Sequence, residues 1–319
     1  MKNIMRYLVL PLVLTLVAVS AWGITFQRVF PDKHTYVYAI EGCDTLRLDH
    51  YVAEREGVRP CVMFLFGGGF ARGERDKEAD MPYFDFLLKA GYDVVSIDYR
   101  LGMKGVKSPG VVEFFRLLDH SIHIAVEDMF RATNFVLERA EEWQINSNQI
   151  IVSGSSAGAI TVLQGEYIIS NGLPLSELLP VDFNYAGVIS FAGAVFSMDG
   201  APEWGENTAP IMLFHGNADR QVPYNKVALF GCGMYGSKYL AEKLKKAGLP
   251  YWFYTVEYET HQMAGKPMYD NHAEIELFIE EFAIKQRKLQ RTTHIVDEAI
   301  PECQTRFFPT AYIGATYDR

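Results

Sequence analysis

The chain has 319 residues, of which 49% are hydrophobic and 22% are charged. This balance excludes a disordered chain, a collagen-like fibre and a small domain held together by disulfides. The 30 lysine and arginine residues are outnumbered by 39 aspartate and glutamate residues, the net charge is −9, and no basic block stands out. We therefore expect no nucleic-acid partner.

The N-terminus has the pattern of a signal peptide. Lys2 and Arg6 precede an apolar run over residues 7–19, and small residues at 19–21 suit a cleavage site. We expect residues 1–21 to be removed on export to the periplasm or outside the cell, leaving no stable membrane span. The alternative is a retained N-terminal membrane anchor, because the residues after position 19 extend the apolar run toward spanning length.

Short apolar segments typical of strands recur along the rest of the chain. They lie at 36–40, 45–53, 61–66, 92–97, 149–152, 188–191, 211–214 and 251–256. Between them, apolar residues recur at helical spacing over 125–136, from 157, over 237–247 and over 275–282. Strands alternating with helices predict a mostly parallel sheet covered on both faces, which binds ligands at the carboxyl ends of its strands.

Three segments are expected to be loops that shape a substrate pocket above this sheet: Gly102–His120, Ala201–Thr208 and Lys226–Gly236. The last stretch, from about residue 290 to 319, lacks clear periodicity. It is expected to be a C-terminal tail.

The chain has four cysteines, at positions 43, 61, 232 and 303. An exported protein with four cysteines can form up to two disulfides. Cys61 opens an apolar run and is expected to be a buried thiol, whereas Cys232 and Cys303 are the pair we most expect to be bonded. No Cys-x-x-Cys or His/Cys cluster is present, so we expect no metal site and no cofactor.

A Gly-Ser-Ser-Ala-Gly motif at 154–158 follows one predicted strand and precedes a predicted helix. In this context the tight turn raises the central Ser156 hydroxyl into the cleft, and the N–H of Ala157 points at the same place. The alternative, a glycine-rich turn with incidental serines, does not account for the strand and helix on either side.

Three glycines, Gly67-Gly68-Gly69, directly follow the strand at 61–66. Glycines let the backbone approach a substrate closely and turn N–H groups toward it. Two such groups together with that of Ala157 would form an oxyanion hole. A phosphate-binding loop is disfavoured, because neither G-K-[ST] nor G-x-G-x-x-G occurs here.

A nucleophilic serine needs a general base. Of eight histidines, His261 is the best placed, since it follows the strand at 251–256 and precedes the last helix. His272 is the second choice. His215 ends another strand and is expected to have a structural role in the turn there.

The base in turn needs an orienting acid. Asp219 follows the end of the strand at 211–214 and is the preferred candidate, with Glu259 and Asp199 as competitors. The resulting order along the chain is serine, aspartate, histidine. Asp98 also follows a strand, but its Asp-Tyr-Arg context indicates a structural ion pair.

Taken together, these motifs resemble the α/β-hydrolase superfamily. More narrowly, they are similar to carboxylesterases related to hormone-sensitive lipase and to the feruloyl-esterase-like branch. The matching stretches are Met63–Phe70, Ser96–Leu101, Gly154–Ala159 and His215–Asp219 with Val222–Tyr224. The resemblance spans about residues 36–286 and implies a single α/β-hydrolase domain over 22–319, with a mostly parallel central sheet and helices on both faces.

By this resemblance Ser156 is the nucleophile, Asp219 the acid and His261 the base. Gly68, Gly69 and the Ala157 N–H would form the oxyanion hole.

The sequence departs from the family in two places. Phe66 stands where the family usually has a histidine that shapes the glycine loop by hydrogen bonding, and Thr260 precedes the base where many relatives have glycine. A phenylalanine side chain cannot form that hydrogen bond.

The expected function is that of an exported serine hydrolase that cleaves carboxylic esters through an acyl-enzyme. Its expected partner is a small-molecule or carbohydrate ester, in which the ester has a short acyl group or links an acyl group to a carbohydrate. A serine peptidase of the same fold is one alternative, because the same triad can cleave amides. A non-catalytic α/β-hydrolase that only binds is another, but all three candidate triad residues are present.

Overall fold

The computed structural model describes residues 31–107, 109–229, 231–309 and 311–312. The predicted signal peptide lies outside these residues. Residues from Pro31 onward form one compact unit. No helix within the described ranges combines the length and the apolar character that crossing a membrane requires.

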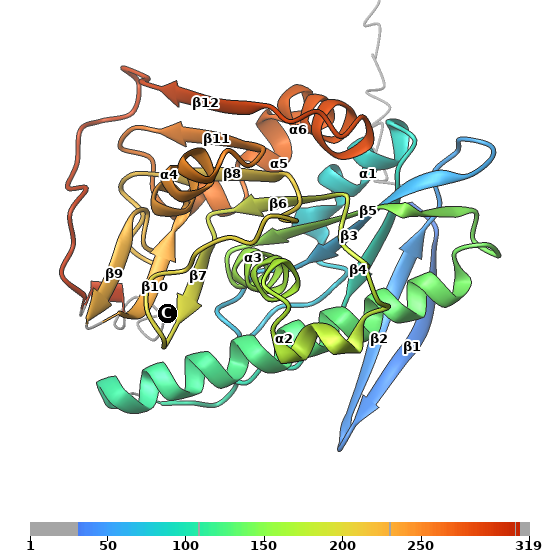
Figure 1. The fold of residues 1–319 in the computed structure, drawn as a ribbon, viewed down its shortest axis with the longest axis horizontal. Helices are drawn as coiled ribbons and strands as arrows, with labels where there is room; N and C mark the ends of the chain where they lie inside the picture. The colour runs from blue at the N-terminus through green and yellow to red at the C-terminus, as the bar shows by residue number, and fades with distance from the viewer. Residues whose placement is uncertain (1–30, 108, 230, 310, 313–319) are drawn as a thin grey trace, which may run out of the picture. The chain divides into compact units, whose positions relative to one another are not determined.

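The unit is built on a nine-stranded sheet with the order β1-β2-β4-β3-β5-β6-β8-β11-β12 (Figure 1). Its strands are β1 (Lys33–Glu41), β2 (Asp44–Tyr51), β3 (Arg59–Leu65), β4 (Asp93–Ile97), β5 (Ile145–Ser155), β6 (Gly187–Phe191), β8 (Ile211–Gly216), β11 (Tyr251–Val256) and β12 (Gln290–Ile295). The first two strands run antiparallel to their neighbours, and all pairs from β4 to β12 are parallel. The predicted, mostly parallel sheet is confirmed.

Helices cover both faces of this sheet. They are α1 (Met81–Lys89), α2 (Val111–Arg139), α3 (Ala157–Ser170), α4 (Ser237–Ala247), α5 (Pro267–Asp270) and α6 (His272–Phe278), which continues into the π-helical turn η4 (Ile279–Ile284). Short 3₁₀ turns occur at η1 (Glu78–Asp80), η2 (Pro174–Leu178) and η3 (His261–Ala264). Figure 1 shows α1 and α6 along one face, and α2 and α3 along the other.

The core lies between these layers. The strands β3, β4 and β6 are buried at every residue, as expected for strands covered on both faces. The helix α3 is also buried along most of its length, so it has no polar face.

Two segments expected to be loops are regular structure instead. Residues 111–120 form the first turns of α2, because Pro109-Gly110 precedes the helix as a start signal and Gly110 is its N-cap. Phe114 and Leu118 are buried one helical turn apart on that helix.

The segment Lys226–Gly236 forms a hairpin of β9 (Lys226–Leu229) and β10 (Cys232–Gly236), in which Gly231 has a φ of 89°. The hairpin pairs with β7 (Ala194–Ser197) in a second, three-stranded sheet of order β7-β10-β9. Its glycines allow the turn and the close approach of the strands, although in the sequence alone they indicate a loop.

The predicted disulfide is wrong. Cys232 and Cys303 are both free thiols, and each contacts a different group. The Sγ of Cys232 contacts the Sδ of Met198 at 3.3 Å, and the Sγ of Cys303 donates to the carbonyl of Tyr258. Cys61 is fully buried as expected, and burial raises the pKa of its thiol.

The stretch expected to be a C-terminal tail begins with β12, which adds to the sheet parallel to β11 over six residue pairs. Figure 1 shows the chain then running from β12 back toward β9 and β10.

Candidate active site

Ser156 lies on the sharp turn between β5 and α3. Its φ of 51° and ψ of −111° are strained for a residue with a side chain, and such strain is characteristic of functional turns. The turn is held by the Ser156 N–H, which donates to the carbonyl of Phe191 at 2.9 Å. A Cβ on Gly154 would lie 2.4 Å from the Gly158 backbone, and one on Gly158 would lie 2.1 Å from the carbonyl oxygen of Leu65. Both glycines are therefore required by the turn.

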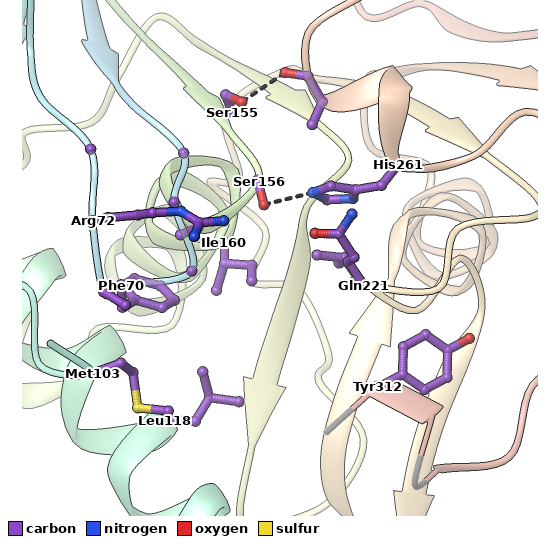
Figure 2. Close-up of a pocket in the computed structure, with 18 of the residues that line it drawn as sticks. Phe70, Arg72, Met103, Leu118, Ser155, Ser156, Ile160, Gln221, His261 and Tyr312 are labelled. Atoms are coloured by element: carbon purple, nitrogen blue, oxygen red, sulfur yellow. Dashed lines mark hydrogen bonds between the residues drawn. The ribbon is translucent and has the colours of Figure 1, made fainter. Parts of the chain in front are cut away.

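The structure brings the three predicted triad residues together. The Oγ of Ser156 lies 2.8 Å from Nε2 of His261 (Figure 2), and Nδ1 of His261 lies 2.7 Å from Oδ2 of Asp219. Ser156 follows β5, Asp219 follows β8 and His261 begins the turn after β11. These strands are parallel, so their carboxyl ends place the three residues at one edge of the sheet.

Asp219 is fully buried and is held at both carboxylate oxygens. Its Oδ1 accepts hydrogen bonds from the N–H groups of Gln221 and Val222, at 2.7 and 3.0 Å. Burial alone would raise the pKa of Asp219. The electrostatic interaction with His261 and the hydrogen bonds from His215 and His261 outweigh it, and hold that pKa well below its usual range. The carboxylate therefore stays ionised beside His261.

The competing candidates lie elsewhere. His272 hydrogen-bonds the carbonyl of Met268 and stacks on Phe86. Glu259 pairs with Lys266 at 2.9 Å, and Asp199 is exposed.

His215 has a contact that the sequence did not indicate. It is buried, as a residue that fixes a turn would be, but its Nε2 also lies 3.2 Å from Oδ2 of Asp219. No local pattern in the sequence indicates this contact, because His215 lies in β8 and Asp219 in the loop that follows it.

The predicted oxyanion residues line the same cavity as Ser156. Gly68 and Gly69 have φ values of 136° and 63°, which favour glycine, and a Cβ on Gly67 would lie 3.1 Å from the Ser155 carbonyl. Ala157 is the first residue of α3, so its N–H has no acceptor within the helix. Among the described residues, the N–H groups of Gly68 and Gly69 also have no acceptor.

Phe66, at the position of the usual histidine, is fixed in another way. Its carbonyl accepts a hydrogen bond from the Tyr99 hydroxyl at 2.7 Å, and its ring stacks on the Tyr99 ring with centroids 4.5 Å apart. Asp98, next to Tyr99, pairs with Arg75 at 3.0 Å, in agreement with the structural ion pair expected there.

The chain is similar to esterases in sequence. The BD-FAE family matches residues 48–167. The juvenile hormone esterase of Tribolium castaneum is 29% identical over 128 residues, which are 39% of this chain and 20% of that protein. Esterase LipI of Mycobacterium tuberculosis is 31% identical over 99 residues, which are 31% of this chain and 26% of that protein. The matches thus span about a fifth to a quarter of these relatives' lengths.

The structure extends the similarity to almost the whole described unit. Apo esterase 2 of Thermogutta terrifontis is 19% identical, with a TM-score of 0.56 over 83% of this chain and 98% of that one. Its propionate-bound form superposes with a TM-score of 0.56 at 20% identity, over 81% of this chain and 96% of that one. The chain has the α/β-hydrolase fold. The predicted resemblance to this superfamily is confirmed.

The α/β-hydrolase domain has a cavity of about 700 Å³ beside Ser156 and His261. Much of its wall is apolar. Figure 2 shows Phe70, Met103, Leu118 and Ile160 on the side of the serine away from His261. The charged residues that also line it are Arg72, Glu74, Lys77 and Asp80.

Part of this wall was missed in the sequence. Phe114 and Phe115 lie on the stretch of α2 that was expected to be a loop, although the spacing of Phe114 and Leu118 is a helical signal. Pro309 and Tyr312 come from the expected tail, for which no local pattern predicts a place in the pocket.

Proposed function

We propose that this α/β-hydrolase is a serine carboxylesterase with Ser156 as nucleophile, His261 as general base and Asp219 as orienting acid. The observation that carries the proposal is the relay of hydrogen bonds from Ser156 through His261 to Asp219, in the wall of a cavity large enough for an ester. The matches to esterases support the same chemistry.

In the first step the Ser156 Oγ attacks the ester carbonyl carbon, and its proton passes to Nε2 of His261. The carbonyl oxygen becomes an oxyanion, which the N–H groups of Gly68, Gly69 and Ala157 are placed to stabilise. Asp219 holds the imidazole in position and stabilises its positive charge.

The tetrahedral intermediate then collapses. The bond to the alcohol oxygen breaks, and His261 gives its proton to that oxygen, leaving the acyl group on Ser156. A water molecule attacks the acyl-enzyme while its proton passes to His261. When the second intermediate collapses, the acid leaves and the proton returns to Ser156.

We propose short acyl esters, including acyl groups on carbohydrates, as substrates. We also propose export, with cleavage after Ala21, on the pattern of the first residues. Expression with the natural N-terminus in a bacterium that exports proteins tests the second point, because the intact mass then shows whether the chain starts at Trp22.

A fluorophosphonate probe and Ser156→Ala test the catalytic role directly. We expect one adduct on the wild type by intact mass and none on the variant. Hydrolysis of 4-nitrophenyl acetate and butyrate should fall by on the order of 10⁴-fold or more in the variant.

Acetylated xylan and peptide anilides, assayed beside the 4-nitrophenyl esters, separate an esterase from a peptidase. A folded wild type that takes no adduct and hydrolyses no ester would contradict the proposal.

A further inference from the structure

Arg72 is fixed to the glycine loop by its backbone. Its N–H donates to the carbonyl of Gly68 at 3.3 Å. A Cβ on Gly68 would lie 2.0 Å from the Arg72 carbonyl oxygen, so the two backbones are in close contact. The position of Arg72 is therefore coupled to the loop that faces the scissile carbonyl.

The side chain of Arg72 lines the catalytic cavity. Figure 2 shows its guanidinium directed into the pocket toward Ser156, on the side opposite His261. Because His261 gives its proton to the leaving alcohol, the alcohol lies on the histidine side. Arg72 consequently lies beside the acyl group.

Arg72 also has no partner within the described part of the chain. No carboxylate there is within ion-pair distance of its guanidinium, and the side chain makes no hydrogen bond there. Neighbouring arginines are engaged, since Arg75 pairs with Asp98 at 3.0 Å and Arg100 pairs with Asp128 at 2.8 Å. Arg72 is thus an exposed, planar double donor at the substrate site that no carboxylate of the described residues neutralises.

The other charged residues of the cavity do not neutralise the positive charge of Arg72. Lys77 adds a second positive charge and Glu74 a negative one, and neither is ion-paired in the residues that the structure describes. Burial raises the pKa of Asp80 to about 6, so this carboxyl carries less than a full charge in mildly acidic conditions.

We infer that Arg72 binds a carboxylate on the acyl group of the substrate, so that the preferred substrates are monoesters of dicarboxylic acids. The guanidinium fork matches the two oxygens of a carboxylate, which favours this anion over a group with one charged atom. The inference rests on the proposed esterase function and names the acyl group for it.

The test compares two esters that differ in one charge: the 4-nitrophenyl monoester of succinic acid and its methyl-capped, neutral counterpart. We expect the wild type to have the higher kcat/KM on the anionic ester. In Arg72→Gln the ratio of the two kcat/KM values should fall by about 10–100-fold, and Arg72→Lys should restore part of it.

Arg116→Gln is the matched control. Arg116 is an exposed arginine on α2 next to the lining residue Phe115, but it does not line the cavity. Its loss changes the net charge by the same amount and should leave the ratio as in the wild type.

Binding gives a second readout. Succinate should inhibit hydrolysis of the neutral ester competitively in the wild type, and the inhibition should be lost in Arg72→Gln. An unchanged ratio in Arg72→Gln, or equal losses on both esters, would overturn the inference.

The esterase proposal does not depend on the role of Arg72. Measurements on the wild type distinguish failure of the inference from failure of the proposed function. If it takes the fluorophosphonate and hydrolyses the neutral ester without any preference for the anionic one, only the role of Arg72 fails. If it does neither, the esterase proposal and the inference fail together.

Discussion

At the scale of single residues, the acid of the proposed triad has a second histidine behind it. Nε2 of His215 faces two acceptors, Oδ2 of Asp219 at 3.2 Å and the carbonyl of Val222 at 3.3 Å, so this nitrogen must carry a proton. Nδ1 of the same ring lies 2.7 Å from the Ser237 hydroxyl, which fixes the ring. His215 is therefore placed to position Asp219 from the side away from His261.

This arrangement predicts a loss of turnover when the donor is removed. His215→Leu should lower kcat by about 10–100-fold with little change in KM, because the carboxylate loses a buried hydrogen bond and the substrate site is not touched. His215→Gln keeps an amide donor near the same place and should recover part of kcat. A fall in Tm without a fall in kcat, or no recovery in the glutamine variant, would contradict a positioning role.

At the scale of elements, α1 begins with a buried acid that is not used as a cap. Asp80 is the N-cap residue of α1 and is 6% exposed, but its side chain makes no capping hydrogen bond. Burial raises its pKa to about 6, and the nearby Lys77 opposes this only in part. The folded protein thus holds a proton on this group more tightly than the unfolded chain does.

The raised pKa of Asp80 makes the folded protein less stable at neutral pH than at acidic pH. Between about pH 4 and pH 6 the unfolded chain loses this proton before the folded protein does, so stability falls as the pH rises and then stays level. Asp80→Asn removes the cost of burying an ionised carboxylate, and should raise the free energy of unfolding by about 3 kcal/mol at pH 8. Urea unfolding of both proteins at pH 8 and pH 4.5 measures this, and the gain should shrink at pH 4.5. A variant less stable than the wild type at pH 8 would refute it.

The elements also show what local pattern can predict. The central strands were readable because each is a short apolar run ended by glycine or polar residues, and the triad candidates follow from strand ends. The start of α2 and the hairpin β9–β10 could not be predicted in this way. Their glycines indicate loops unless the packing around them is known. The contact of His215 with Asp219 and the place of Tyr312 in the cavity depend on tertiary structure, which no local spacing encodes.

At the scale of the whole unit, the C-terminal segment has two separate roles. The strand β12 covers the edge of β11, and the residues after it bring Pro309 and Tyr312 to the cavity. The segment also contacts the loop that carries Asp219. There, the Arg220 guanidinium lies 5.2 Å from the centre of the Phe307 ring.

Two truncations separate these roles. A chain that ends at Ile300 keeps β12, and should retain a Tm near that of the wild type while its KM for short esters changes, because one wall of the cavity is gone. A chain that ends at Leu289 leaves the β11 edge unpaired, and should be much less stable and prone to aggregate. Thermal unfolding and light scattering measure the stability and the aggregation of both truncated chains. Equal stability of the two would show that β12 does not protect the edge of β11.

The stacking of Phe66 on Tyr99 predicts which residues occur together at these positions among related sequences. A third residue belongs to the same contact, because a Cβ on Gly73 would lie 2.4 Å from the Phe66 ring. A change at any one of the three positions alone disturbs the glycine loop, so we expect them to be inherited together. Among relatives, phenylalanine at the first position should occur with tyrosine and glycine at the other two, and a histidine there should release both from this constraint.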